Sequence, residues 1–222
     1  MLFALGTPVA FAALVCSFLL GLVLRAVAIR VAARRLGFAH RGESITPRLR
    51  EDVDPFGAVA AAIGGMGWGK QLSVDEIPRH RGRGRAAMVF LAGPLTCIVV
   101  GEVLIGAYAL AFPGDLLTFI GPADVLLGIN LPAGQAILLS LGVGLLSFGL
   151  LALIPIPPLD GFGVLYSALR RPGNGMQWMR LWFEDKNIGV LILLICCLFP
   201  LPYSFLLRIV DALGLFFVRV WG

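Results

Sequence analysis

The chain has 222 residues, of which 59% are apolar and 14% charged, and its formal net charge is +5. Soluble globular proteins carry about a quarter of their residues as charged side chains, so this composition excludes that class and indicates an integral membrane protein. No polar stretch is long enough to form a second domain. We therefore expect one all-helical membrane domain over residues 1–222.

The basic residues are concentrated in two parts of the chain. Of the 18 Lys and Arg residues, 12 lie between Arg25 and Arg85, and the other six lie at Arg170 or beyond. Such clusters are typical of cytoplasmic loops, where they face anionic lipid headgroups, and they do not require nucleic-acid binding. We predict an N-terminus outside the cell and an outward 113–135 loop. The predicted cytoplasmic loops are 30–54, 70–85 and 170–186.

Apolar runs bounded by charges or prolines predict the helices in chain order. A first span covers residues 7–30. A glycine-rich piece at 58–68 is too short to cross a bilayer and is typical of a re-entrant segment. Further spans are predicted at 86–112 and 136–154, followed by a short helix at 160–169. The last two predicted spans, 188–199 and 203–221, are both short for a full crossing.

Five segments, in this order, resemble motifs of the site-2 protease family of intramembrane zinc metalloproteases, in particular its short bacterial members. They are Ala33-Arg-Arg-Leu-Gly37, Asp54-Pro-Phe-Gly57, Gly67-Trp-Gly-Lys70, Leu91-Ala-Gly-Pro-Leu95 and Leu153-Ile-Pro-Ile-Pro-Pro-Leu-Asp-Gly161. The resemblance implies a site-2-protease-like helical bundle in the bacterial cytoplasmic membrane.

The catalytic residues of that family are replaced. Its zinc-binding His-Glu-x-x-His would immediately precede the Ala33–Gly37 match, where this chain has Arg25, Ala26 and Ile29. None of these side chains can ligate zinc or act as a general base at neutral pH. Two asparagines typical of the family align with Cys97 and Ala152. Of the zinc ligands, the resemblance leaves only the aspartate of Leu-Asp-Gly, Asp160. We therefore predict neither a metal nor another cofactor, although a lipid or a partner's cofactor nearby remains compatible with the sequence.

Two interpretations of Arg25 and Asp160 are open at this stage. In one, Arg25 extends to the lipid headgroups and Asp160 caps the helix that begins at Gly161. In the other, the guanidinium takes the place of zinc as the cation that faces Asp160, and the two form a buried ion pair.

Two further sites are candidates for a functional role. Glu102 lies in the middle of the 86–112 span, where it is expected to be hydrogen-bonded or paired with a partner, or else to belong to a proton or ion pathway. Trp178, Trp182 and Phe183 lie beside the membrane, as an aromatic belt or a partner-docking surface.

The sequence thus predicts a pseudoprotease without enzymatic activity. We expect it to bind transmembrane helices of other integral membrane proteins, as a structural or assembly subunit of a larger complex. The alternatives are an active intramembrane metalloprotease with a non-standard site, or an ion-pathway or proton-pathway subunit that uses Glu102.

Overall fold

The structure is a computed structural model that describes residues 1–38, 44–114 and 120–221. Within these residues all regular elements are helical, and the one β-type pairing is an isolated antiparallel bridge between Val53 and Gly69. The fold is therefore an all-α bundle. Its helices are α1 (Pro8–Arg35), α2 (Leu49–Asp52), α3 (Pro55–Gly64), α4 (Arg83–Ala111), α6 (Pro122–Leu127), α7 (Ala133–Leu153), α8 (Asp160–Ala168), α9 (Asn174–Met179), α10 (Ile188–Leu198) and α11 (Phe205–Val218), with 3₁₀ turns η1 (Leu2–Gly6) and η2 (Arg79–Arg81) and a π-helical turn η3 (Arg180–Asp185).

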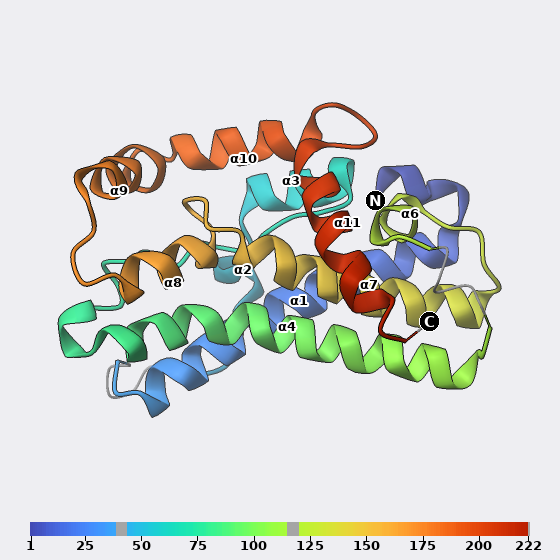
Figure 1. Ribbon diagram of the computed structural model, residues 1–222. Coiled ribbons are helices and arrows are strands. Elements are labelled where there is room, and N and C mark those ends of the chain that lie inside the picture. The colour runs from blue at the N-terminus through green and yellow to red at the C-terminus, as the bar shows by residue number, and fades with distance from the viewer. Residues whose placement is uncertain (39–43, 115–119, 222) are drawn as a thin grey trace.

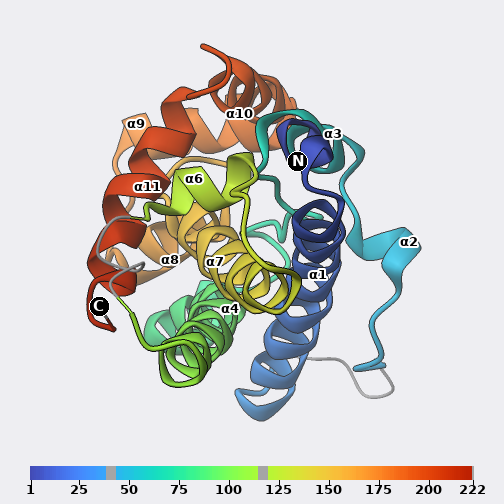
Figure 2. The ribbon, with the colours of Figure 1, turned by 90° about the vertical axis from the view of Figure 1, so that its right-hand side faces the viewer.

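Three long apolar helices, α1, α4 and α7, form the centre of the bundle and lie side by side (Figures 1 and 2). In the described part of the chain these three are long and apolar enough to cross a membrane. Small residues let α4 and α7 approach closely, since a Cβ on Gly101 would lie 2.7 Å from the backbone nitrogen of Leu146. The expected spans at 7–30, 86–112 and 136–154 are present, with ends shifted by up to five residues.

Of the two C-terminal helices, α10 ends one residue before the predicted 188–199 run ends, and α11 is shorter than the predicted 203–221 run at both ends. α10 has 11 residues and α11 has 14, and the chain between them contains Pro200 and Pro202. A bilayer crossing needs about 20 helical residues, so neither helix is long enough for a full span. The prediction of spans at 188–199 and 203–221 is corrected accordingly, because the apolar composition there continues past the points where the helices end.

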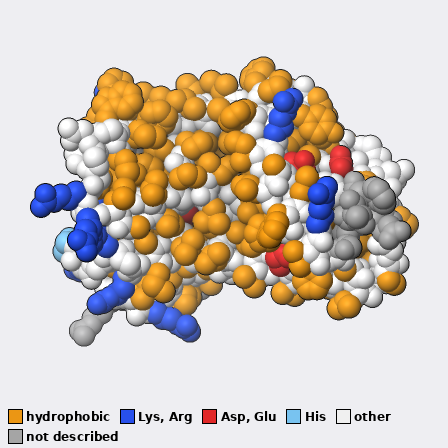
Figure 3. All heavy atoms as spheres, viewed as in Figure 1, with side chains coloured by type: hydrophobic (Ala, Val, Ile, Leu, Met, Phe, Trp, Pro, Cys, Tyr) orange, Lys and Arg blue, Asp and Glu red, His pale blue; other side chains and the backbone are white. Residues whose placement is uncertain are grey.

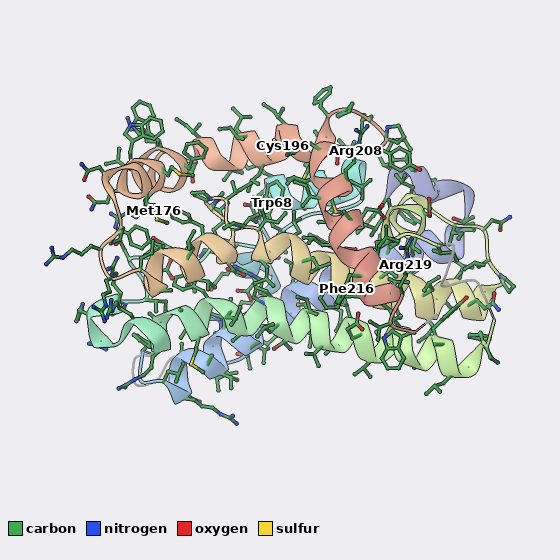
Figure 4. The ribbon with its side chains drawn as sticks, viewed as in Figure 1. Trp68, Met176, Cys196, Arg208, Phe216 and Arg219 are labelled. Atoms are coloured by element: carbon green, nitrogen blue, oxygen red, sulfur yellow. The ribbon has the colours of Figure 1, made fainter. Side chains whose placement is uncertain are left out.

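The expected re-entrant segment is a short helix followed by an extended return. Asp54 caps α3 by accepting a hydrogen bond from the backbone N–H of Phe56, and its second oxygen accepts the indole N–H of Trp68 at 3.0 Å. Trp68 is labelled in Figure 4. A Cβ on Gly57 would lie 2.0 Å from the carbonyl oxygen of Trp68, so only glycine allows the extended segment that contains Trp68 to pack this closely on α3.

The charged residues mark the two ends of the bundle. Lysines and arginines gather at the end where α1 stops and α4 starts, while most of the side face in Figure 3 is apolar. We call this end the basic end, defined by Arg34, Arg35, Arg83 and Arg85. The N-terminus and α6 lie at the opposite end.

Candidate functional site

Arg25 lies on the inner face of α1, where the apolar pattern of the helix places it. Leu22, Ala26 and Ile29 are buried beside it at helical spacing, and Arg25 itself is only 8% exposed. The opposing helix α4 contributes Gly93, whose absent side chain makes room for that of Arg25. A Cβ on Gly93 would lie 2.7 Å from Cγ of Arg25 and 3.1 Å from Cδ1 of Ile29.

Asp160 is the first residue of α8, just after the chain has turned at Pro155–Pro158. The turn is tight, since a Cβ on Gly161 would lie 2.0 Å from the carbonyl oxygen of Leu153 at the end of α7. Folding back at this point directs the Asp160 carboxylate into the bundle, and the residue is 3% exposed.

The structure joins these two residues in a bidentate ion pair. Nε of Arg25 donates to Oδ2 of Asp160 at 2.6 Å, and Nη2 donates to Oδ1 at 2.6 Å. The third nitrogen, Nη1, donates to the carbonyl oxygen of Lys70 at 2.8 Å. The interpretation in which Arg25 reaches the headgroups is therefore wrong. Asp160 also makes no side-chain capping bond, and α8 begins one residue earlier than that interpretation requires.

Such parallel hydrogen bonds match the planar guanidinium to both oxygens of a carboxylate, which is the strong form of this contact. One side chain thus connects α1, the segment after the re-entrant helix, and α8. Because removal of either charge would leave the other buried without its partner, the pair is held as a unit.

A cavity of about 450 Å³ lies beside the pair and opens between the basic loops. Arg25, Ala26 and Ile29, the three positions of the altered motif, all contribute to its lining. Arg30 also lines it, and its Nη2 donates to Oδ1 of Asp52 at 2.5 Å. This second ion pair fixes the loop before α3 to α1. Of the charged residues that line the cavity, Arg25, Arg30, Glu51 and Asp52 are held in internal ion pairs.

The residues around this cavity do not fit a zinc ion. Catalytic zinc takes three protein ligands and a water molecule. Among the described residues no group of three His, Cys, Asp or Glu side chains comes close enough to hold a metal. Both oxygens of Asp160 already accept hydrogen bonds from Arg25. His80 is exposed in η2, and His40 lies outside the described residues.

The two positions at which the resemblance implies asparagine are buried. Cys97 on α4 is fully buried, and its thiol points to the carbonyl oxygen of Gly21 at 3.6 Å. Ala152 at the end of α7 is 4% exposed. These positions therefore supply packing atoms and a weak hydrogen bond.

Glu102 lies far from this site. One carboxylate oxygen accepts the indole N–H of Trp221 at 2.9 Å, and the other is buried without a hydrogen-bond partner. The ring of Trp221 covers Gly106, one turn further along α4. The structure thus gives Glu102 a hydrogen bond that holds the segment after α11 against α4, a contact for which the sequence offered no signal.

The aromatic residues near the basic end form one cluster. The rings of Trp178 and Trp182 are 5.7 Å apart, and those of Trp178 and Phe183 are 6.4 Å apart. Lys186 places its ammonium 4.0 Å from the ring of Trp182. Trp178 is 56% exposed. The cluster is thus an exposed aromatic surface, and the three aromatic residues are not among those that line the cavity.

Sequence reasoning missed two parts of the site, Lys70 and the pair of Arg30 with Asp52. Lys70 takes part through its backbone carbonyl, which no side-chain pattern can reveal. Asp52 precedes the Asp54-Pro-Phe-Gly57 motif, and an acidic residue before a re-entrant helix was the available signal for a partner of Arg30.

The all-helical bundle and its three long apolar helices define this chain as a multi-pass membrane protein. It is similar to a Bacillus subtilis (strain 168) protein with the curated name "Putative zinc metalloprotease YwhC", with 25% identity over 152 residues. The match covers 67% of this chain and 62% of that relative, so the chain spans less than two thirds of the relative's length. No protein-family model matches the chain, and no solved structure is significantly similar to it.

Proposed function

We propose that this chain is a catalytically inactive, site-2-protease-like protein of the bacterial cytoplasmic membrane, with its N-terminus outside. In this proposal it binds transmembrane helices of other membrane proteins and acts as a structural or assembly subunit of a larger complex. The observation that carries the proposal is the buried pair of Arg25 and Asp160, which puts a fixed cation where the resemblance implies zinc. The distant similarity to a relative named as a zinc metalloprotease supports descent from such an enzyme.

The chemistry of the pair supports inactivity. Hydrolysis of a peptide bond at a zinc site needs a metal-activated water molecule and a general base. Arginine stays protonated at any physiological pH, so Arg25 cannot accept a proton, and Ala26 and Ile29 carry no polar group. The ion pair instead stabilises the arrangement of α1, the segment that contains Lys70, and α8. A bundle of this kind keeps lateral helix faces on which small residues and buried polar groups can select a partner helix.

Metal analysis of the purified protein tests inactivity. We expect substoichiometric zinc after dialysis against zinc-containing buffer. The matched control is the triple variant Arg25→His, Ala26→Glu, Ile29→His, which puts two imidazoles one turn apart on the face of α1 that contacts Asp160. We expect this variant to bind about one zinc ion and to gain thermal stability when zinc is added. Stoichiometric zinc in the unaltered protein would overturn the proposal.

Purification in mild detergent tests the assembly role. We expect defined membrane proteins to copurify in fixed ratio. The variant Glu102→Gln separates this role from an ion pathway, because the amide oxygen can still accept the Trp221 hydrogen bond but the side chain no longer titrates. A flux that disappears in Glu102→Gln while copurifying proteins stay would favour the pathway. Membrane-peptide cleavage by the unaltered protein, absent from the Asp160→Asn variant, would establish an enzyme.

A further inference from the structure

α11 differs from the three central helices in having two distinct faces. Its inner face packs on α6 and α7 and is apolar except for Asp211, while its outer face exposes Leu213 and Phe216 together with two arginines, Arg208 and the C-cap residue Arg219. Phe216 is 73% exposed. Figure 4 labels both arginines and Phe216, and Figure 3 shows basic side chains in blue on this face, among apolar side chains and a few acidic ones in red.

The two arginines have no ion-pair partner among the residues that the structure describes, where the ion-paired arginines are Arg25, Arg30, Arg48 and Arg180. Two acidic residues lie close to this part of α11, Asp211 on the helix itself and the exposed Asp124 on α6, and neither forms an ion pair with an arginine among the residues that the structure describes. Asp211 accepts a hydrogen bond from the backbone N–H of Ala123 at 2.8 Å, which fixes α11 to the start of α6. An exposed guanidinium on the lateral face of a membrane protein is costly unless it reaches a phosphate group or an acidic partner.

The direction of α11 decides between the phosphate group and the acidic partner. Both ribbon views show α11 crossing the bundle steeply, while α1, α4 and α7 run along its long axis (Figures 1 and 2). If those three helices cross the membrane, α11 runs largely in the membrane plane, in the half of the bundle that contains α6. A 14-residue helix with cations near both ends and an apolar stretch between them is typical of a helix that lies at the headgroup boundary.

We propose that α11 is an interfacial helix, and that Arg208 and Arg219 bind the phosphate groups of anionic phospholipids in the leaflet away from the basic end. The two residues are 11 positions apart, or about 16 Å along the helix. They therefore hold two separate headgroups, while Leu213 and Phe216 enter the acyl region between them. This site is independent of the Arg25–Asp160 pair and of the proposed assembly role.

Photocrosslinking from position 212 tests the proposal. Ala212 is exposed on the same face, one turn after Arg208 and one turn before Phe216. The full chain, with benzoylphenylalanine at position 212, is reconstituted into vesicles of phosphatidylglycerol and phosphatidylcholine. We expect crosslinks to phosphatidylglycerol in excess of its share, and each of Arg208→Gln and Arg219→Gln to reduce that excess about five-fold. The control variant Arg48→Gln, Arg50→Gln removes two charges elsewhere and is expected to leave the excess unchanged.

Other outcomes would overturn the proposal. Equal crosslinking to both lipids would show that the arginines select no anionic headgroup. A crosslink to another protein in native membranes, lost in Arg208→Gln, would identify an acidic partner in place of lipid. Competition by inorganic phosphate would point to a soluble anion. The phosphatidylcholine crosslink is the reference for the excess, because this lipid carries the same phosphate group without a net negative charge.

Discussion

Replacing Arg25 by methionine is expected to destabilise the protein far more than an ordinary surface substitution. The change leaves the Asp160 carboxylate 3% exposed and without either guanidinium hydrogen bond. Loss of one partner of a buried pair costs about 3–5 kcal/mol, because the remaining charge stays desolvated. Loss of the Nη1 bond to the Lys70 carbonyl adds about 1 kcal/mol. We therefore expect the free energy of unfolding to fall by about 4–6 kcal/mol.

A double-mutant cycle measures the pair itself. Asp160→Leu alone should cost about as much as Arg25→Met, since it leaves the guanidinium buried. The double variant Arg25→Met, Asp160→Leu removes both charges. Apart from the lost bond to Lys70, its free energy of unfolding is expected to differ from that of the unaltered protein by less than about 2 kcal/mol. The assay is unfolding in mixed micelles with increasing sodium dodecyl sulfate, followed by tryptophan fluorescence.

The exposed pair of Arg48 and Glu51 provides the control. Its side chains are 60% and 56% exposed, so Arg48→Met should change stability by less than about 1 kcal/mol. If the losses of unfolding free energy in the two single variants of the buried pair add up to the loss in the double variant, the two residues are not coupled. That result would refute the reasoning that the guanidinium compensates the buried carboxylate.

Two further changes test the packing around the site. Gly93→Ala is expected to lower the free energy of unfolding by about 1–3 kcal/mol, because the new Cβ would lie 2.7 Å from Cγ of Arg25. The control is Gly84→Ala on the same helix, where a Cβ meets nothing within 4 Å. We expect this variant to be as stable as the unaltered protein, or more stable, in the same unfolding assay. Equal effects at both glycines would contradict the close approach. Trp68→Phe removes the indole hydrogen bond to Asp54 and should lower stability by about 1 kcal/mol, with faster proteolysis of the re-entrant segment as the second readout. Unchanged proteolysis would show that the bond does not hold that segment.

Much of the helical core was predictable because its signals are local. The long apolar runs of α1, α4 and α7 and the prolines that end α7 are visible in composition alone. The C-terminal helices were overestimated for the same reason. Apolar composition does not distinguish a residue inside α10 from one in the turn that follows, so the runs appeared longer than the helices are.

The site was predictable only as a pair of alternatives. The resemblance implies a metal ligand at the position of Arg25 and a second one at Asp160, but these residues are 135 positions apart. Whether they meet depends on the tight turn at Gly161 and on the space that Gly93 leaves on α4, both of which are tertiary features. The contact of Glu102 with Trp221 could not be predicted for a related reason, because it depends on how α11 crosses the bundle.

The ion pair constrains how this chain could acquire a metal site. Arg25 uses three nitrogens to connect three separate elements, so a single substitution toward such a site, such as Arg25→His, would remove all of those bonds at once. Such an intermediate would be destabilised before a second imidazole at position 29 could provide zinc affinity. A metal site is therefore hard to reach from this ion pair one substitution at a time.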